Sequence, residues 1–218
     1  MNSWSKSMKI KILLLTLLCI PILALAKTAD GAKLKDHLKT VQLCTRDSCV
    51  TALVFDAHLY QPTPEEFMTS IKDIPVGTTI LLSGYGKDVT SGVKVGEMIR
   101  TKQLKTKVGR LGAANLDRTG FYKRAGVCLS ACAMAFMGGV NREFDAEDQF
   151  GVTAIEPNRP NLSEQDLQAG LANTEGYLSR MNIQPSFFKY LKALNDTKLH
   201  MIDVKAATSY NIINSPAK

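Results

Sequence analysis

The chain has 218 residues, of which 45% are hydrophobic and 22% charged, and its formal net charge at pH 7 is +7. This length suits one domain with a full hydrophobic core and leaves little room for a second. The basic residues are scattered, and no basic face interleaved with aromatic residues is present, which argues against nucleic-acid binding.

The first 26 residues have the pattern of a secretory signal peptide. Lys6, Lys9 and Lys11 give a positive region at the start of a short apolar stretch over residues 10–22, and Ala24-Leu25-Ala26 has the spacing of a cleavage site. The apolar stretch is shorter than the ~20 residues that a membrane-spanning helix needs. We therefore expect residues 27–218 to be exported, most simply to the periplasm, as a single domain without a membrane anchor.

Residues 40–43 and 50–55 flank a short polar turn and predict a β-hairpin. Cys44 and Cys49 stand at the two ends of this turn. Four cysteines remain after removal of the signal peptide, and an even number in an exported chain is typical of disulfide bonds. We therefore expect a bridge between Cys44 and Cys49.

Helix and strand patterns alternate in the next part of the chain. A capping-box pattern with proline at the first helical position starts at Thr63, and a buried strand is predicted over residues 78–83. Gly84-Tyr85-Gly86 is interpreted as a turn into a second helix. A short strand over residues 104–108 and a long polar loop over residues 109–125 follow.

The segment around Ser130 predicts a strand, a turn and an alanine-rich helix that ends at Gly138. A charged connection then leads to a strand over residues 150–155. The helices predicted after this strand begin at Ser163, Pro185 and Asp203. Strands and helices that alternate with short connections predict an α/β fold with a mainly parallel sheet.

Two features of the Ser130 segment each have two interpretations. The serine can be a nucleophile on a strand-to-helix turn, or a helix N-cap whose oxygen accepts a backbone N–H. Cys128 and Cys132 can form a bridge if the backbone between them is not regular helix, or they can be buried small hydrophobic residues. The sequence leaves both questions open.

No pattern predicts a metal or a cofactor. The three histidines, His37, His58 and His200, do not cluster with the cysteines, so the four ligands of a zinc site are missing. We expect no cofactor.

Three segments, in order and at fitting spacing, resemble the Clp protease proteolytic subunit of the Clp/crotonase superfamily, and more closely a group of exported bacterial Clp-like proteins. Residues 81–92 resemble the strand and helix that carry one oxyanion donor, and residues 128–139 resemble the nucleophile turn and its helix. Residues 150–153 resemble the strand end that carries the general base. Residues 195–213 resemble the stretch that holds the catalytic aspartate.

The resemblance implies a spiral of ββα units that is usually oligomeric. It implies Ser130 as the nucleophile position, Thr153 at the position of the expected histidine, and Asp196 at the aspartate. The oxyanion would be held by backbone N–H groups of Ala131 and of the stretch that contains Tyr85 and Gly86.

Thr153 is the main departure from the family pattern. A serine needs a base within hydrogen-bond reach, and a threonine cannot accept a proton near pH 7. Loss of the base typically lowers the rate by a factor on the order of 10⁴–10⁶. His200, close in sequence to Asp196, and Lys123 are the alternative bases that the sequence offers.

Two functions follow. The first is a periplasmic pseudoenzyme with a degenerate serine-hydrolase-type site, which binds or assembles an unknown peptide or protein and can be a homo-oligomer. The second is an active serine peptidase or acyl hydrolase that uses Ser130 with a non-standard base.

Overall fold

The computed structural model describes residues 38–56, 64–86, 88–114, 119–155 and 163–215. The predicted signal peptide and cleavage site, and also His37, His58 and Thr63, lie outside these residues. Within them, no helix is both long and apolar enough to cross a membrane.

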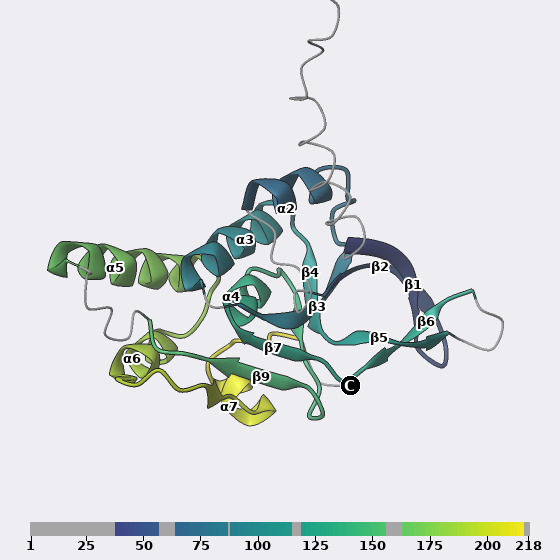
Figure 1. Ribbon diagram of the computed structural model, residues 1–218. Helices are drawn as coiled ribbons and strands as arrows, with labels where there is room; N and C mark the ends of the chain where they lie inside the picture. Colours follow the sequence, from purple (N-terminus) through teal and green to yellow (C-terminus); the bar gives the residue numbers. More distant parts are fainter. Residues whose placement is uncertain (1–37, 57–63, 87, 115–118, 156–162, 216–218) are drawn as a thin grey trace, which may run out of the picture.

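The centre of the fold is a ten-stranded sheet in which most neighbouring strands run parallel (Figure 1). Its main path is β10-β9-β7-β3-β2-β1-β6-β5, and β4 and β8 form a side branch next to β3. The strands are β1 (Leu38–Cys44), β2 (Cys49–Asp56), β3 (Thr79–Gly86), β4 (Lys105–Val108), β5 (Arg110–Ala114), β6 (Phe121–Arg124), β7 (Val127–Ser130), β8 (Arg142–Glu143), β9 (Gln149–Val152) and β10 (His200–Met201). The expected α/β class with a mainly parallel sheet is confirmed.

The described helices connect and cover these strands. They are α2 (Pro64–Ile71), α3 (Val89–Thr101), α4 (Ala131–Met137), α5 (Glu164–Arg180), α6 (Pro185–Ala193) and α7 (Val204–Ser209). Three successions of two strands and a helix occur in chain order: β1-β2-α2, β6-β7-α4 and β8-β9-α5. This order agrees with the expected ββα units.

Strand β3 connects the two parts of the sheet. Its first half, Thr79–Leu82, pairs with β4, and its last three residues pair with β7, so that Gly86 is in register with Ser130. The apolar run Ile80–Leu82 is buried, as expected for a central parallel strand with both faces covered. The Ser83 hydroxyl donates to the carbonyl of Val127 at 3.4 Å and accepts from its N–H at 3.3 Å, which adds a cross-strand link to β7.

The predicted hairpin is confirmed. Its strands are antiparallel, with Leu38 opposite Phe55 at the open end and Cys44 opposite Cys49 at the turn. The expected bridge between Cys44 and Cys49 is present, with their Cα atoms 4.0 Å apart. Because the two cysteines face each other at the last pair of the ladder, the bridge closes the hairpin where the turn begins.

Two predictions about loops are wrong. Gly84-Tyr85-Gly86 is not a turn but the end of β3, because its backbone is held in the ladder with β7. The stretch 109–125 contains an antiparallel strand pair, β5 and β6, and β6 also pairs in parallel with β1. These strands are short and only partly buried, and their sequences lack the apolar alternation that indicates a strand.

Helices α3 and α4 pack closely over the sheet because glycines remove side chains from the contact. A Cβ at Gly92 would overlap the carbonyl oxygen of Ala131, and a Cβ at Gly96 would overlap the hydroxyl of Tyr177. The Tyr177 hydroxyl donates to the carbonyl of Met134 at 2.5 Å, which ties α5 to α4. The α3–α4 contact therefore also fixes the first residue after Ser130.

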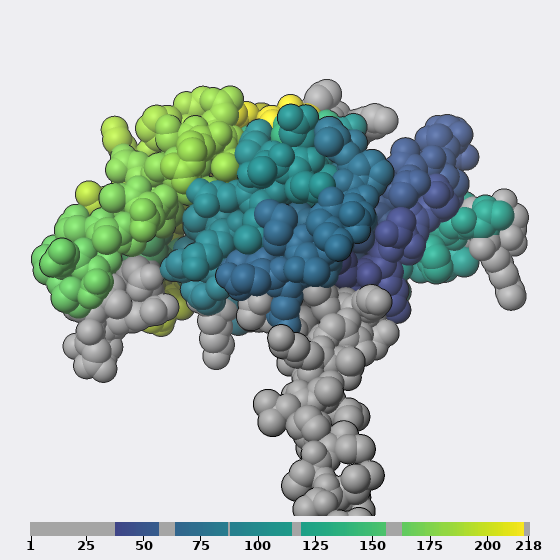
Figure 2. All heavy atoms as spheres, turned by 90° about the horizontal axis from the view of Figure 1, so that it is seen from above, coloured from purple at the N-terminus to yellow at the C-terminus, as the bar shows by residue number. Residues whose placement is uncertain are grey.

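Helix α5 has its buried residues only in its C-terminal half. Its capping residue Ser163 accepts from the N–H of Asp166, as predicted, and its buried residues are Thr174, Tyr177 and Leu178. The preceding turns are exposed or half-buried. Figure 2 shows α5, in green, at one end of the molecule and the purple hairpin toward the other.

Candidate active site

The backbone at Ser130 has an uncommon conformation, with φ 56° and ψ −112°. A residue with a side chain rarely takes positive φ, and such conformations cluster at functional sites. The other described residues of this kind that are not glycine, Gln103, Asn182 and Asn211, each follow the capping residue of a helix C-terminus, where positive φ is common. Ser130 instead lies between the end of β7 and the start of α4.

The side chain of Ser130 does not cap the helix that follows it. Its Oγ lies 3.0 Å from Oγ1 of Thr153, and either hydroxyl can be the donor. Ser130 is only 2% exposed. The N-cap interpretation of Ser130 is therefore wrong, and the predicted neighbour Thr153 is indeed brought to it, directly after β9.

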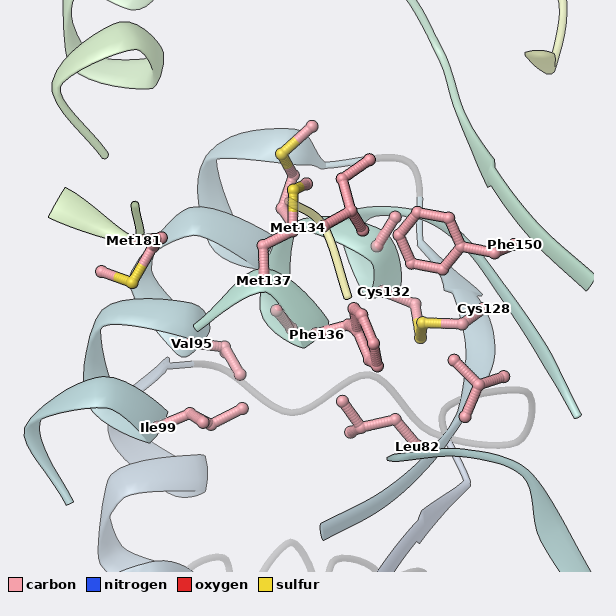
Figure 3. Close-up of a cluster of buried hydrophobic side chains, with 14 of the residues drawn as sticks. Leu82, Val95, Ile99, Cys128, Cys132, Met134, Phe136, Met137, Phe150 and Met181 are labelled. Carbon is pink, nitrogen blue, oxygen red and sulfur yellow. A yellow bond between two sulfur atoms is a disulfide. The ribbon is translucent and has the colours of Figure 1, made fainter. Parts of the chain in front are cut away.

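Cys128 and Cys132 are bridged across Ser130, which resolves the question that the sequence left open. Cys128 lies in β7 and Cys132 is the second residue of α4, and their Cα atoms are 5.1 Å apart. The change from strand to helix at Ser130 makes this spacing possible. Figure 3 shows the bridge in the buried cluster that contains Phe136 and Phe150.

The residues expected to hold an oxyanion lie on two neighbouring elements. Ala131 is the first residue of α4, and Tyr85 and Gly86 are the last two residues of β3, in register with Leu129 and Ser130. Their backbones are therefore next to the nucleophile position. Because β3 continues through Gly86, these backbone groups belong to a paired strand rather than to the turn predicted over Gly84-Tyr85-Gly86.

Asp196 and His200 form a pair on the far side of β9. Asp196 Oδ1 lies 2.8 Å from His200 Nε2, and this hydrogen bond lowers the pKa of Asp196 below its ordinary value against a weaker opposing effect of desolvation. In β10, His200 is in register with Val152, the residue before Thr153. Within the described part of the chain, no hydrogen bond joins His200 to Ser130 or Thr153.

Lys123, the other alternative base, is engaged elsewhere. Its Nζ lies 2.9 Å from carboxylate oxygens of both Asp148 and Asp145. Burial alone would lower the pKa of Lys123, but the hydrogen bonds and charges of these two carboxylates raise it on balance. A lysine held protonated by two carboxylates does not serve as a base for Ser130.

Asp148 positions the two strands of the site, a role that the sequence analysis missed. Its side chain is fully buried. It accepts from the N–H of Gly126 at 2.8 Å, just before β7, and from the N–H of Asp145 at 2.9 Å, in the loop before β9. Sequence reasoning placed Asp148 in a charged connection, where nothing distinguishes it from its acidic neighbours.

An apolar row crosses the sheet next to Ser130. Tyr85, Leu129, Gly151 and Met201 are in register on β3, β7, β9 and β10. Leu129 Cδ2 and Met201 Sδ lie over Gly151, at 3.2 and 3.0 Å from where its Cβ would be. Tyr85 is 39% exposed and Met201 is 52% exposed, so the row reaches the surface at both ends. We call these four residues the apolar row.

Among the residues that the structure describes, no three His, Cys, Asp or Glu side chains are grouped so that they could hold a metal ion. The site thus consists of two hydroxyls, a bridge, backbone groups and a nearby Asp–His pair. Hydroxyls alone do not activate one another near pH 7, because neither accepts a proton there.

No protein-family model matches the sequence, and no curated protein matches it. Among solved structures, ClpP1 from Listeria monocytogenes and a variant of it are each 12% identical, with 69% of this chain and 78% of that chain covered and a TM-score of 0.48. A protein described only as an enzyme is 8% identical, with 76% of this chain and 94% of that one covered and a TM-score of 0.49.

Proposed function

We propose that this chain is an exported Clp-like pseudoenzyme, which keeps the nucleophile turn of a serine hydrolase and binds a peptide or protein without hydrolysing it efficiently. The observation that carries the proposal is the 3.0 Å contact between Ser130 Oγ and Thr153 Oγ1. Ser130 is in the position of a nucleophile, with positive φ, but its described side-chain partner is another hydroxyl. Export, a periplasmic location and homo-oligomeric assembly are parts of this proposal.

The apolar row supports the binding role. Exposed apolar side chains that lie together on a surface mark sites where a partner is bound. Leu129 in this row directly precedes Ser130, and Met201 lies on β10, at the edge of the sheet. We propose that an extended apolar segment of a partner lies along the row, next to the former catalytic centre.

The catalytic part of the proposal is tested with a fluorophosphonate probe, which labels activated serines. Because Ser130 is only 2% exposed, the probe is applied both to the oxidised and to the dithiothreitol-reduced protein. We expect no labelling of the mature protein in either state, and labelling of reduced Thr153→His, because a histidine there would accept the Ser130 proton. Thr153→Asn, with a side chain that is not a base, is the matched control and should stay unlabelled. Stoichiometric labelling of the unmodified protein that is lost in Ser130→Ala would contradict the proposal.

The Asp196–His200 pair favours a second candidate, an active hydrolase. When Nε2 donates to Asp196, the neutral ring keeps its lone pair on Nδ1, and this atom would be the base. In that case the probe labels the unmodified protein, His200→Gln abolishes the labelling, and Lys198→Gln on the same segment does not. Equal labelling of the two variants would exclude His200 as the base.

The binding part is tested with carboxymethylated α-lactalbumin, a permanently unfolded polypeptide, in fluorescence anisotropy titrations. We expect Met201→Glu to weaken binding at least tenfold, because the new charge must be desolvated against an apolar ligand. Val76→Glu is the matched control, since Val76 is 68% exposed but lies in the turn before β3. Equal affinities of the two variants, or no binding of the probe, would contradict a binding role for the row.

A further inference from the structure

The Cys128–Cys132 bridge encloses only Leu129, Ser130 and Ala131. A bridge stabilises the whole fold less when the loop that it closes is short. The two elements that it joins are already fixed, because β7 is paired with both β3 and β9, and α4 is buried over most of its length. The bridge therefore acts mainly on the turn itself.

The turn is the part of this segment that needs a constraint. Ser130 has positive φ, a conformation that persists only where the surroundings enforce it. Its side chain does not cap α4. The bridge spans Ser130 directly, because it links Cys128 in β7 to Cys132 in the first turn of α4.

The two cysteines are compatible with the core in either oxidation state. Cys128 is fully buried and Cys132 is 8% exposed, within the cluster around Phe136 and Phe150 (Figure 3). A free cysteine packs as a small hydrophobic residue, so opening the bridge leaves the cluster filled. We therefore expect the fold to persist when the bridge is reduced, whereas the constraint on Ser130 is lost.

We propose that the Cys128–Cys132 bridge is a redox-sensitive lock that holds Ser130 buried against Thr153, and that a dithiol reductant releases the turn and exposes the Ser130 hydroxyl. A thiolate of the dithiol attacks Cys132 Sγ, the sulfur of the less buried cysteine, and Cys128 Sγ leaves and takes a proton. The second thiol then displaces Cys132 Sγ, so that two electrons and two protons pass to the protein and the dithiol becomes a disulfide. The lock would regulate the site of the proposed function. Only the consequence of the lock for partner binding rests on that function.

The test is amide hydrogen exchange of the folded protein before and after treatment with dithiothreitol, with the bridges counted by alkylation and mass. We expect exchange over the turn, residues 129–132, to become at least tenfold faster on reduction, while the amides of α6, which carries neither bridge, do not change. Cys128→Ala/Cys132→Ala should exchange at the fast rate without reductant. Cys44→Ala/Cys49→Ala, which removes only the hairpin bridge, should exchange at the slow rate until it is reduced.

Three results would overturn the lock: unchanged exchange in a protein whose Cys128–Cys132 bridge is shown to be open, opening of the bridge only on global unfolding, or equal effects of the two double variants. If Cys128→Ala/Cys132→Ala does not fold, the reduced Cys44→Ala/Cys49→Ala protein decides the question alone. Because exchange is measured without a ligand, failure of the lock is distinguished from failure of the proposed binding function.

Discussion

At the scale of single residues, the site depends on a conformation that serine does not favour. A residue held at positive φ outside a helix end costs on the order of 1–3 kcal/mol, and Ser130 keeps this conformation although it makes no cap and its hydroxyl meets only Thr153 among the described side chains. No hydrogen bond of a helix cap offsets this cost in Ser130. The conformation is therefore enforced by the surrounding structure, and it is consistent with the nucleophile position that we propose for Ser130.

The strain at Ser130 predicts that glycine is tolerated there better than alanine. In a regular element, an alanine-to-glycine change costs about 0.5–1 kcal/mol, but at positive φ glycine is favoured. Both variants lose the hydrogen bond with Thr153, so we expect Ser130→Gly to be at least as stable as Ser130→Ala in urea unfolding. Ala135→Gly, in the middle of α4, is the control and should cost about 1 kcal/mol. A less stable Ser130→Gly would show that Ser130 is not strained.

The pair Ser130 and Thr153 could be predicted from sequence because each lies in a short segment whose order and spacing indicate its place. The position of His200 could not. Its register with Val152 depends on β10, a strand of two residues without any alternation to reveal it. The apolar row could not be predicted either, because its four residues come from four strands, one of them is a glycine, and one lies on β10.

At the scale of elements, helices could be predicted from their capping residues, whereas strands could be predicted only where a buried apolar run marks them. Ser163 caps its helix as predicted, Asp203 caps the helix predicted to begin there, and β2, β3 and β7 coincide with apolar runs. Strands β5 and β6 were missed because they are short and show no alternation of apolar and polar residues, and they are held by pairing rather than by burial of an apolar face. Element contacts that depend on glycine are likewise invisible to periodicity.

The contact of α3, α4 and α5 at Gly96 predicts a specific non-additive effect. The methyl group in Gly96→Ala would displace the Tyr177 hydroxyl, which is buried and donates to Met134. We expect a loss of about 2–4 kcal/mol in urea unfolding, from overpacking and the broken hydrogen bond. Tyr177→Phe removes the displaced oxygen, so the double variant should be more stable than the sum of the single effects.

The matched control for this cycle is Gly176→Ala. It lies on α5 beside Tyr177, and its new Cβ would meet only the flexible end of Arg180 at 3.2 Å. Because alanine favours the helix over glycine, this variant should be neutral or stabilising. Additive effects of Gly96→Ala and Tyr177→Phe would show that the hydroxyl does not limit the approach of the helices.

At the scale of the whole molecule, buried charges join segments that are distant in sequence. Arg142 is fully buried and donates to five carbonyl groups, those of Met137, Gly139, Met181, Asn211 and Ile212. These carbonyls follow or end α4, α5 and α7, where the last carbonyls of a helix lack intrahelical partners. Burial, and then repulsion by Arg100, lower the pKa of Arg142 to about 10, so the guanidinium is still charged at neutral pH. One side chain thus closes three helix ends.

A second group of buried charges joins β6 to the loop before β9 and predicts how stability depends on pH. Lys123 has a raised pKa, so its contribution is complete below its ordinary pKa of 10.5 and is lost as the pH rises through the higher folded value. Hydrogen bonding to Lys123 and the charges of Lys107 and Lys123 outweigh burial and lower the pKa of Asp145 below 3.8, so its contribution is lost as the pH falls through that lower value. Lys123→Met leaves Asp148 buried without this cation and should cost about 3 kcal/mol at pH 7.

The destabilisation by Lys123→Met should therefore stay constant across neutral pH and shrink both above pH 10.5 and below pH 3.8, where the unmodified protein loses the same interaction. Urea unfolding of both proteins across this range measures the difference directly. Lys105→Met, an exposed lysine on β4, is the control and should change stability by less than about 0.5 kcal/mol at every pH. A difference that stays constant into the alkaline range would mean that Lys123 contributes through the packing of its aliphatic chain. The start of β7, and with it Ser130, would then be positioned by Asp148 and its backbone partners alone.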